Sequence, residues 1–417
     1  MSKFRRVMCF LLSVVAFACL LPVPGAAQEI ALASEAAVLM DAESGQILYG
    51  KNMDSTMYPA SITKVLTGLL ALKYAKETDQ VTMTQAGVSQ VPRTSSHIAL
   101  EPGEAFTMKD ALYALALVSA NDAAVAIAET VSGSVEDFAK LMNEEAEKLG
   151  AYNSHFVNPN GMPNQDHYTT ARDMALITAE ALKQEGFLTY FGAKSYDMPA
   201  TNLSAARPLV SKNQFIDGTF DCPGLLMSKT GWTSSALGTL VTAVKRGDTT
   251  LIAVTLKSPM LEDKYTDTLA LLDYGFTNYR RVRLSQKLME RKMVAQGMDA
   301  DCSLEGYTPQ DVLIPQTAGE ADIAVTVPGG FDSSLGVSTV PASVDVKQED
   351  GTWIHVTDLL LTIRDPEPEV EALAETEGAE APAGTEAKAI HPGAAILLGL
   401  AVVFFLFRFI GKRKVTV

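Results

Sequence analysis

The sequence has few cysteines and histidines, and their spacing argues against the common metal sites. Its 417 residues include only four cysteines and five histidines. Neither Cys-x-x-Cys nor His-x-x-x-His, the spacings typical of zinc ligands, occurs. We therefore expect no metal and no cofactor. Cys9 and Cys19 lie in an N-terminal apolar segment, and sequence alone leaves open whether Cys222 and Cys302 pair.

Positive charge is also scarce. Lysine and arginine total 34 against 49 acidic residues, a formal net charge of -15, which argues against nucleic acid as a partner. Much of the acidic excess falls between Asp365 and Lys388, so it says little about the rest of the chain. The hydrophobic fraction of 47% is enough for a sizeable core and excludes wholesale disorder.

The first 27 residues have the pattern of a secretory signal peptide. Basic residues at 3–6 precede the apolar stretch Val7–Leu21 and then small residues, and we expect cleavage after Ala27, with Ala33 as the alternative. A lipoprotein signal at Cys19 is disfavoured because the apolar run continues past that cysteine.

A second apolar segment lies near the C-terminus. Residues 392–407 are uncharged, Arg408 can extend its charge to the interface, and we expect a transmembrane anchor at 392–410 with a cytoplasmic basic tail at 411–417. Residues 365–391 are rich in Glu, Pro and Ala and are expected to form an extended acidic linker. A cell-wall sorting signal would need Leu-Pro-x-Thr-Gly, which is missing. The protein is thus expected to be exported and held at the outer face of the cell membrane.

Between these ends the pattern predicts an α+β domain followed by a small all-β domain. Residues 28–276 show two hairpins, one near each end, and a strand, Leu225–Lys229, beside the second. Helical periodicity predicts helices between them at 61–75, 108–131, 135–149 and 171–184. This order fits an antiparallel sheet flanked by helices. In residues 277–364 short alternating runs are separated by Gly, Pro and Asp, as in a β-rich domain.

Three short motifs carry the chemistry. In Ser61-Ile-Thr-Lys64, positions i and i+3 share a helix face, so the lysine amine can reach the serine hydroxyl. A serine is a weak nucleophile until a base takes its proton, and a lysine can act as that base only when its amine is neutral. The other motifs are Ser119-Ala-Asn121 and Lys229-Thr-Gly231. A second lysine near the first would lower its pKa.

Each motif alone is common, but the three in this order, with spacers of domain scale, are specific. The sequence resembles the low-molecular-mass penicillin-binding proteins that are serine D-Ala-D-Ala carboxypeptidases. The resemblance extends to five longer stretches: Tyr58-Pro-Ala-Ser-Ile-Thr-Lys64, Ser96-His-Ile-Ala-Leu-Glu-Pro-Gly-Glu104, Leu117-Val-Ser-Ala-Asn-Asp-Ala-Ala124, Tyr168-Thr-Thr-Ala-Arg-Asp-Met-Ala175 and Leu272-Asp-Tyr-Gly-Phe276. It implies that residues 28–276 are the catalytic domain, with a serine β-lactamase/transpeptidase-like fold.

The resemblance also implies the roles of single residues. Ser61 would attack the peptide between two D-alanines and form an acyl-enzyme, with Lys64 as general base. Ser119 and Asn121 would relay protons and hold the substrate amide. The substrate-binding residues would be Lys229, Thr230, Gly231 and Trp232, the N–H groups of Ser61 and Trp232 forming the oxyanion hole. Implied partners are peptidoglycan stem peptides ending in D-Ala-D-Ala, β-lactam antibiotics as acylating inhibitors, and the cytoplasmic membrane.

Three positions depart from the family pattern. Residues 236–239 read Ala-Leu-Gly-Thr where relatives have an Ala-Gly-Tyr-Asn type stretch, and Lys264 stands where many have an arginine. Asn160 replaces a histidine of some relatives. None of the three is expected to be catalytic. His97, His155 and His167 are expected to be structural or at the surface.

Two other functions fit part of the pattern. A class A β-lactamase shares the fold and the motifs, but it needs a deacylating glutamate, usually in Glu-x-x-Leu-Asn, and no such element lies between Asn121 and Lys229. A non-catalytic cell-wall-binding or antibiotic-sensing protein could keep the fold. The three intact motifs argue against it.

Overall fold

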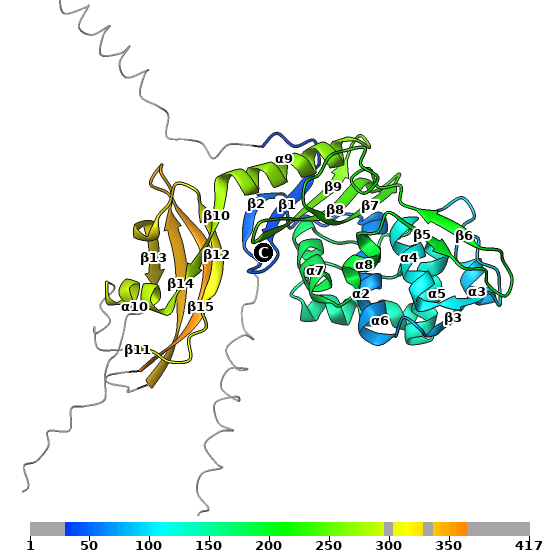
Figure 1. Cartoon of the computed structure of the whole chain (residues 1–417), viewed down its shortest axis with the longest axis horizontal. Coiled ribbons are helices and arrows are strands. Elements are labelled where there is room, and N and C mark those ends of the chain that lie inside the picture. The colour runs from blue at the N-terminus through cyan, green and yellow to red at the C-terminus, as the bar shows by residue number, and fades with distance from the viewer. Residues whose placement is uncertain (1–29, 296–302, 328–336, 365–417) are drawn as a thin grey trace, which may run out of the picture. The chain divides into compact units, whose positions relative to one another are not determined.

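A five-stranded antiparallel sheet with helices on both faces forms the larger part of the protein (Figure 1). The computed structural model describes residues 30–295, 303–327 and 337–364. Strand order in the sheet is β2-β1-β9-β8-β7, so strands from both ends of this region pair in the middle. The strands are β1 (Ala36–Asp41), β2 (Ile47–Lys51), β7 (Leu225–Thr233), β8 (Leu237–Arg246) and β9 (Thr249–Ser258).

The central strands are buried on both faces. All six residues of β1 are buried, as are most of β8 and β9, because helix α9 (Asp263–Asn278) packs on β8 and β9 and helix α7 (Ala171–Lys183) packs on β1 and β9. Such strands read as nearly continuous apolar runs, and both predicted hairpins are formed, β1 with β2 and β8 with β9. The predicted α+β fold is confirmed.

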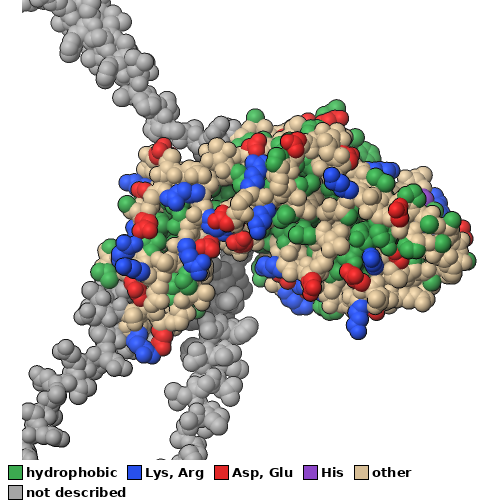
Figure 2. All heavy atoms as spheres, viewed as in Figure 1, with side chains coloured by type: hydrophobic (Ala, Val, Ile, Leu, Met, Phe, Trp, Pro, Cys, Tyr) green, Lys and Arg blue, Asp and Glu red, His purple; other side chains and the backbone are tan. Residues whose placement is uncertain are grey.

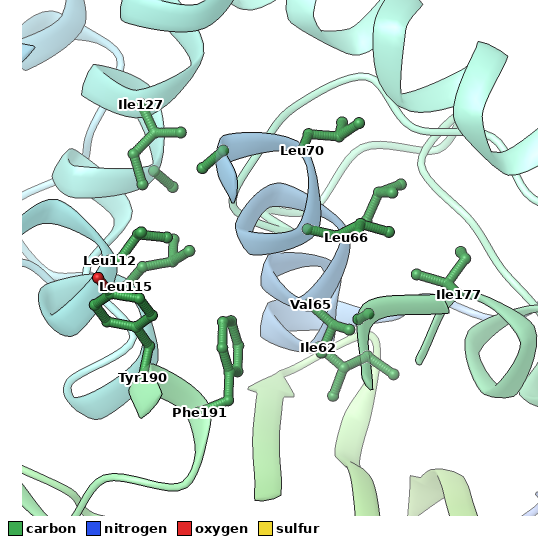
Figure 3. Close-up of a cluster of buried hydrophobic side chains, with 14 of the residues drawn as sticks. Ile62, Val65, Leu66, Leu70, Leu112, Leu115, Ile127, Ile177, Tyr190 and Phe191 are labelled. Carbon is green, nitrogen blue, oxygen red and sulfur yellow. The ribbon is translucent and has the colours of Figure 1, made fainter. Parts of the chain in front are cut away.

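A helix that is buried over most of its length lies among the other helices of the domain. Helix α2 (Lys64–Tyr74) follows the short 3₁₀ helix η1 (Ala60–Thr63), and its first eight residues are buried. Figure 3 shows Val65, Leu66 and Leu70 of α2 among side chains of the surrounding helices, including Ile127 and Phe191. The nucleophile motif is thereby fixed at one end of a well-buried helix.

Helix α2 is surrounded by α4 (Met108–Leu117), α5 (Asn121–Ser132), α6 (Val135–Lys148), α7 and α8 (Phe187–Phe191). Polar caps set where several of these helices begin. The Thr107 side chain accepts from the Asp110 N–H in a capping box, and the Thr170 side chain accepts from the Asp173 N–H at the start of α7. Smaller elements complete this region: α3 (Gln85–Ser89), β3 (Gln80–Thr82), β4 (Ala105–Thr107), β5 (Ser195–Met198) and β6 (Arg207–Val210).

The prediction of one helix from Met108 to Val131 is wrong. The helix is broken between α4 and α5, where Ser119 has a φ of 58°. Left-handed backbone is costly for a residue with a Cβ, so the surrounding structure must hold it in place. The break turns the Ser119 side chain toward β7.

A separate cluster of buried apolar side chains lies in the β-rich region after α9. A two-stranded sheet pairs β10 (Tyr279–Leu284) with β12 (Gln310–Pro315), and a four-stranded sheet has the order β11-β15-β14-β13. Its strands are β11 (Ser303–Leu304), β13 (Ile323–Thr326), β14 (Val337–Lys347) and β15 (Trp353–Arg364), accompanied by α10 (Gln286–Val294) and η2 (Glu320–Asp322). The predicted β-rich domain is therefore present.

Polar contacts join this region to the sheet. The Gln46 amide donates to the Leu313 carbonyl at 2.8 Å and accepts from the Leu313 N–H at 3.0 Å. Arg281 donates to the buried carboxylate of Asp41 at 2.8 Å. On the face drawn in Figure 2, basic and acidic side chains are interspersed, without a large patch of one sign.

Several predictions fall outside the described residues. They are the signal peptide, the acidic linker, the C-terminal anchor and basic tail, and Cys302. Cys222 is buried with a free thiol, and burial raises its pKa to about 11. None of the helices in the described ranges has the length and apolar character needed to cross a bilayer.

Candidate active site

Ser61 lies in η1, one turn before the start of α2. Its Oγ is 2.9 Å from the Lys64 Nζ, as the i, i+3 spacing predicts. The preceding residue, Ala60, has a φ of 51°, so the turn that presents the serine is strained. The serine hydroxyl reaches a solvent-accessible pocket, whereas Lys64 is fully buried beneath it.

The contacts of Lys64 define its reactive form. Its Nζ donates to Asn121 Oδ1 and to the Asn160 carbonyl, each at 2.6 Å. Burial, and then the positive charge of Lys229, lowers the pKa of Lys64 well below its ordinary value. A neutral amine has two N–H groups and one lone pair. Because the two carbonyl oxygens take both N–H groups, the lone pair is left for the Ser61 hydroxyl. The geometry therefore suits a general base.

Lys229 approaches from the sheet. It is buried on β7, and its Nζ donates to Ser119 Oγ at 3.0 Å and to the Thr230 carbonyl at 2.8 Å. Burial, and then the charge of Lys264, lowers the pKa of Lys229 to about 7. The ammonium of Lys229 thus holds the strained Ser119 turn against the strand and adds the positive charge that acts on Lys64.

Strand β7 touches the nucleophile turn at Gly231. A Cβ at this position would lie 2.8 Å from the Ser61 nitrogen and 3.0 Å from Ala60 Cβ, and would overlap the Thr239 hydroxyl. Only glycine allows this approach. Thr239, in the stretch that departs from the family pattern, is fully buried and donates to the Pro59 carbonyl at 2.8 Å. Thr239 therefore supports the nucleophile turn and is not among the residues that line the pocket at Ser61.

A pocket of about 270 Å³ collects the exposed parts of these motifs. Its lining includes Ser61, Ser119, Lys229, Thr230, Gly231 and Trp232. Lys64 and Asn121 lie below it. All eight residues singled out from the sequence are thus brought together by α2, the α4–α5 turn and β7.

Two residues that the sequence marked only as departures from the family pattern, Asn160 and Lys264, also contribute to the site. The main-chain carbonyl of Asn160 accepts a hydrogen bond from Lys64. Every residue has such a carbonyl, so the residue type at this position could not predict the contact. Lys264 lines the pocket with only 5% of its surface exposed, and burial lowers its pKa to about 8. None of the described side chains that line this pocket is acidic, so Lys229 and Lys264 make it suited to an anion. In the sequence, Lys264 was marked only by standing where many relatives have an arginine.

Among solved structures, the fold resembles that of penicillin-binding proteins. Penicillin binding protein 5 from Haemophilus influenzae superposes on 81% of this chain and 99% of its own, with a TM-score of 0.64. At 24% identity this likeness concerns the fold.

Sequence comparison gives the family. A profile described as D-alanyl-D-alanine carboxypeptidase matches residues 24–260, and the chain belongs to this family of serine peptidases. The D-alanyl-D-alanine carboxypeptidase DacF of Bacillus subtilis (strain 168) is 36% identical over 256 residues, covering 60% of this chain and 64% of the relative. DacA of Haemophilus influenzae is 32% identical over 289 residues, covering 67% and 71%. The chain thus spans slightly less than two thirds of the Bacillus relative's length. The predicted family is confirmed.

Proposed function

We propose that the protein is a serine D-alanyl-D-alanine carboxypeptidase that removes the terminal D-alanine from peptidoglycan stem peptides and is acylated by β-lactams. The observation that carries the proposal is the buried amine of Lys64. Both N–H groups of the neutral amine donate to carbonyl oxygens, and its lone pair faces Ser61 Oγ. Membership of the family supports the substrate class.

Acylation begins with proton transfer. Lys64 takes the Ser61 proton as Oγ attacks the carbonyl carbon of the penultimate D-alanine, and the carbonyl oxygen becomes an oxyanion. The N–H groups of Ser61 and Trp232 stabilise that charge, a contribution of about 3 kcal/mol for each donor. The close approach of Gly231 to the Ser61 nitrogen supports a shared position for these two donors.

The terminal carboxylate explains the cationic pocket. Thr230, Lys229 and Lys264 line the same pocket as Ser61, and a carboxylate bound to them would hold the scissile peptide over the hydroxyl. Lys264 provides charge without the two-pronged geometry of an arginine. This requirement for a free carboxylate accounts for cleavage at the end of the peptide.

Collapse of the intermediate breaks the C–N bond. The proton held by Lys64 passes through the Ser119 hydroxyl, which hydrogen-bonds to Lys229, to the leaving nitrogen, so that Lys64 is neutral again and free D-alanine departs. Water then attacks the Ser61 ester while Lys64 accepts the proton of the water, and Lys64 gives that proton to Ser61 Oγ as the ester C–O bond breaks, which releases the shortened peptide and restores the serine. A β-lactam would acylate Ser61 in the same way, but its leaving group stays tethered and the ester persists.

Mass spectrometry after incubation with labelled penicillin tests the proposal. We expect one adduct per chain on the peptide that contains Ser61, and loss of the adduct in Ser61→Ala and Lys64→Ala. Lys73→Ala is the matched control, because Lys73 lies on the same helix but pairs with Glu145 and Glu180. Labelling of Ser61→Ala at the wild-type level, or rapid release of hydrolysed penicillin, would contradict the proposed mechanism.

We also propose that the chain is exported and tethered to the outer face of the cell membrane. The support comes from the sequence: the signal-peptide pattern of residues 1–27, the acidic linker at 365–391, and the uncharged stretch with a basic tail from 392 onward. In this arrangement the domains proposed at 28–276 and 277–364 would face the cell wall.

A further inference from the structure

The strained turn before Ser61 is held by a hydroxyl. Ala60 is 2% exposed and has a φ of 51°, a region of backbone conformation that is strained for a non-glycine residue. Thr63 Oγ1 donates to the Ala60 carbonyl at 2.8 Å. Gly161 packs directly on that carbonyl, and a Cβ there would overlap it. The Ala60 carbonyl is therefore confined between the helix start and a second loop.

His167 completes a chain of hydrogen bonds to this carbonyl. It is 1% exposed, and its Nδ1 accepts from the Val157 N–H at 3.1 Å. The ring proton must then be on Nε2, which lies 2.9 Å from Thr63 Oγ1. Burial lowers the pKa of His167 to about 3, so the ring stays neutral. Nε2–H donates to the Thr63 hydroxyl, and that hydroxyl donates to the Ala60 carbonyl.

These hydrogen bonds fix the direction of the Ser61 N–H through the geometry of the peptide bond. The Ala60 carbonyl and the Ser61 N–H belong to one planar trans peptide, so they point in opposite directions. Fixing the carbonyl oxygen against Thr63 fixes the direction of the Ser61 N–H. On the side toward the sheet, the Ser61 nitrogen faces Gly231 of β7.

We propose that Thr63 and His167 are positioning residues that aim the Ser61 N–H at the oxygen of the acylating substrate. The inference rests on the proposed function, because it gives this N–H the oxyanion in the acylation step. Thr63 sets the peptide plane. His167 orients the Thr63 hydroxyl, since its Nε2–H occupies one lone pair of Oγ1 and leaves the hydroxyl proton for the Ala60 carbonyl. Neither residue touches the substrate.

Conservative variants separate aiming from packing. Thr63→Val keeps the shape but removes the hydroxyl, and we expect the acylation rate and kcat to fall about tenfold or more, with KM little changed. Thr63→Ser keeps the hydroxyl and should restore most of the rate. His167→Leu should resemble Thr63→Val, whereas His167→Gln offers an amide N–H and should be intermediate. In the double variant Thr63→Val/His167→Leu the two losses should not add, because both act through one hydroxyl.

Thr178→Val is the matched control. Thr178 is fully buried and its hydroxyl donates to the Met174 carbonyl within α7, so its loss removes a comparable bond away from the pocket. We expect it to lower thermal stability and leave kcat at the wild-type value. The acid midpoint of the acylation rate should also stay unchanged in Thr63→Val, since Lys64 keeps its three partners.

The outcomes are distinct. If Thr63→Val acylates at the wild-type rate, or if Thr63→Ser is as slow as Thr63→Val, the hydroxyl does not aim the N–H and the inference fails. A shifted acid midpoint would place the effect on Lys64 and overturn it as well. Failure of the proposed function would be seen separately, as wild-type protein that neither cleaves a D-Ala-D-Ala peptide nor forms the Ser61 adduct. If His167→Leu does not fold, Thr63→Val and His167→Gln still decide the question.

Discussion

Gly231→Ala should disable acylation with a modest loss of stability. The added Cβ would lie 2.8 Å from the Ser61 nitrogen, where ordinary contacts begin at 3.4 Å, and it would also overlap the Thr239 hydroxyl. Strand β7 and η1 must therefore separate by about half an ångström or more. That movement would displace Ser61 from Trp232 and weaken the Thr239 bond to the Pro59 carbonyl.

The expected magnitudes differ for stability and for rate. Overpacking at such a contact lowers the free energy of unfolding by about 1–3 kcal/mol. A displacement approaching 1 Å between reacting groups costs roughly 10²-fold in rate. We expect the second-order rate constant for acylation by penicillin to fall by that factor in protein that remains folded.

The assay needs a control that is destabilised without a change at the site. Gly45 has a φ of +75° and open space around it, so Gly45→Ala strains the backbone of the β1–β2 turn and should cost about 1 kcal/mol. Urea unfolding and stopped-flow acylation are measured on both variants. If Gly231→Ala acylates as fast as Gly45→Ala, the close approach of β7 to the nucleophile turn does not position the reacting groups.

Two further predictions concern charge and localisation. Folding lowers the pKa values of Lys229 and Lys264 from 10.5 to about 7 and about 8. Between these values and 10.5 the unfolded chain binds more protons than the folded chain, so the contribution of the two lysines to the free energy of unfolding rises with pH over this range. In urea titrations Lys229→Met should rise less steeply with pH, and curves parallel to wild type would contradict this. A chain ending at residue 391 should keep penicillin labelling but move from the membrane pellet to the soluble exported fraction, whereas membrane retention of the shortened chain would argue against the anchor.

The sequence predicts the sheet and its helices well because burial on both faces imposes simple patterns. Strands β1, β8 and β9 lie between helices, so their sequences are apolar runs bounded by turn residues. Helix α7 begins at Ala171, as predicted, and the Thr170 side chain caps it there. Both the strands and the helix start are set by residues close together in the sequence or by a regular spacing of apolar residues.

The α4–α5 break could not be predicted in the same way. Apolar residues continue at helical spacing through it, and Ala120 is buried like its helical neighbours. The break depends on Lys229, which is 110 residues away and holds Ser119 at 3.0 Å. A backbone conformation that is stabilised by a side chain far away in the sequence does not change the spacing of apolar residues near the break.

In the site too, some features could be predicted from the sequence and others could not. Residue types and order predicted the two lysines, the serines and Asn121, because side-chain chemistry restricts which residues can serve. The parts that were missed act through main-chain atoms: the Asn160 carbonyl on Lys64, the Ala60 carbonyl on Thr63, and the Pro59 carbonyl on Thr239. Any residue has a carbonyl, so only the fold reveals which one is used. His167 was expected to be structural or at the surface because the sequence shows no partner for it, and its partner hydroxyl lies 104 positions away in the chain.

Burial is the physical link between the fold and the proposed chemistry. A lysine at the start of an exposed helix would keep its proton at neutral pH and could not activate a serine. Here the most buried helix of the domain carries Lys64, and the desolvation that lowers its pKa comes from the same packing that forms the core. Loosening the core around α2 should therefore reduce acylation before it unfolds the protein, because water admitted beside Lys64 would restore its charge.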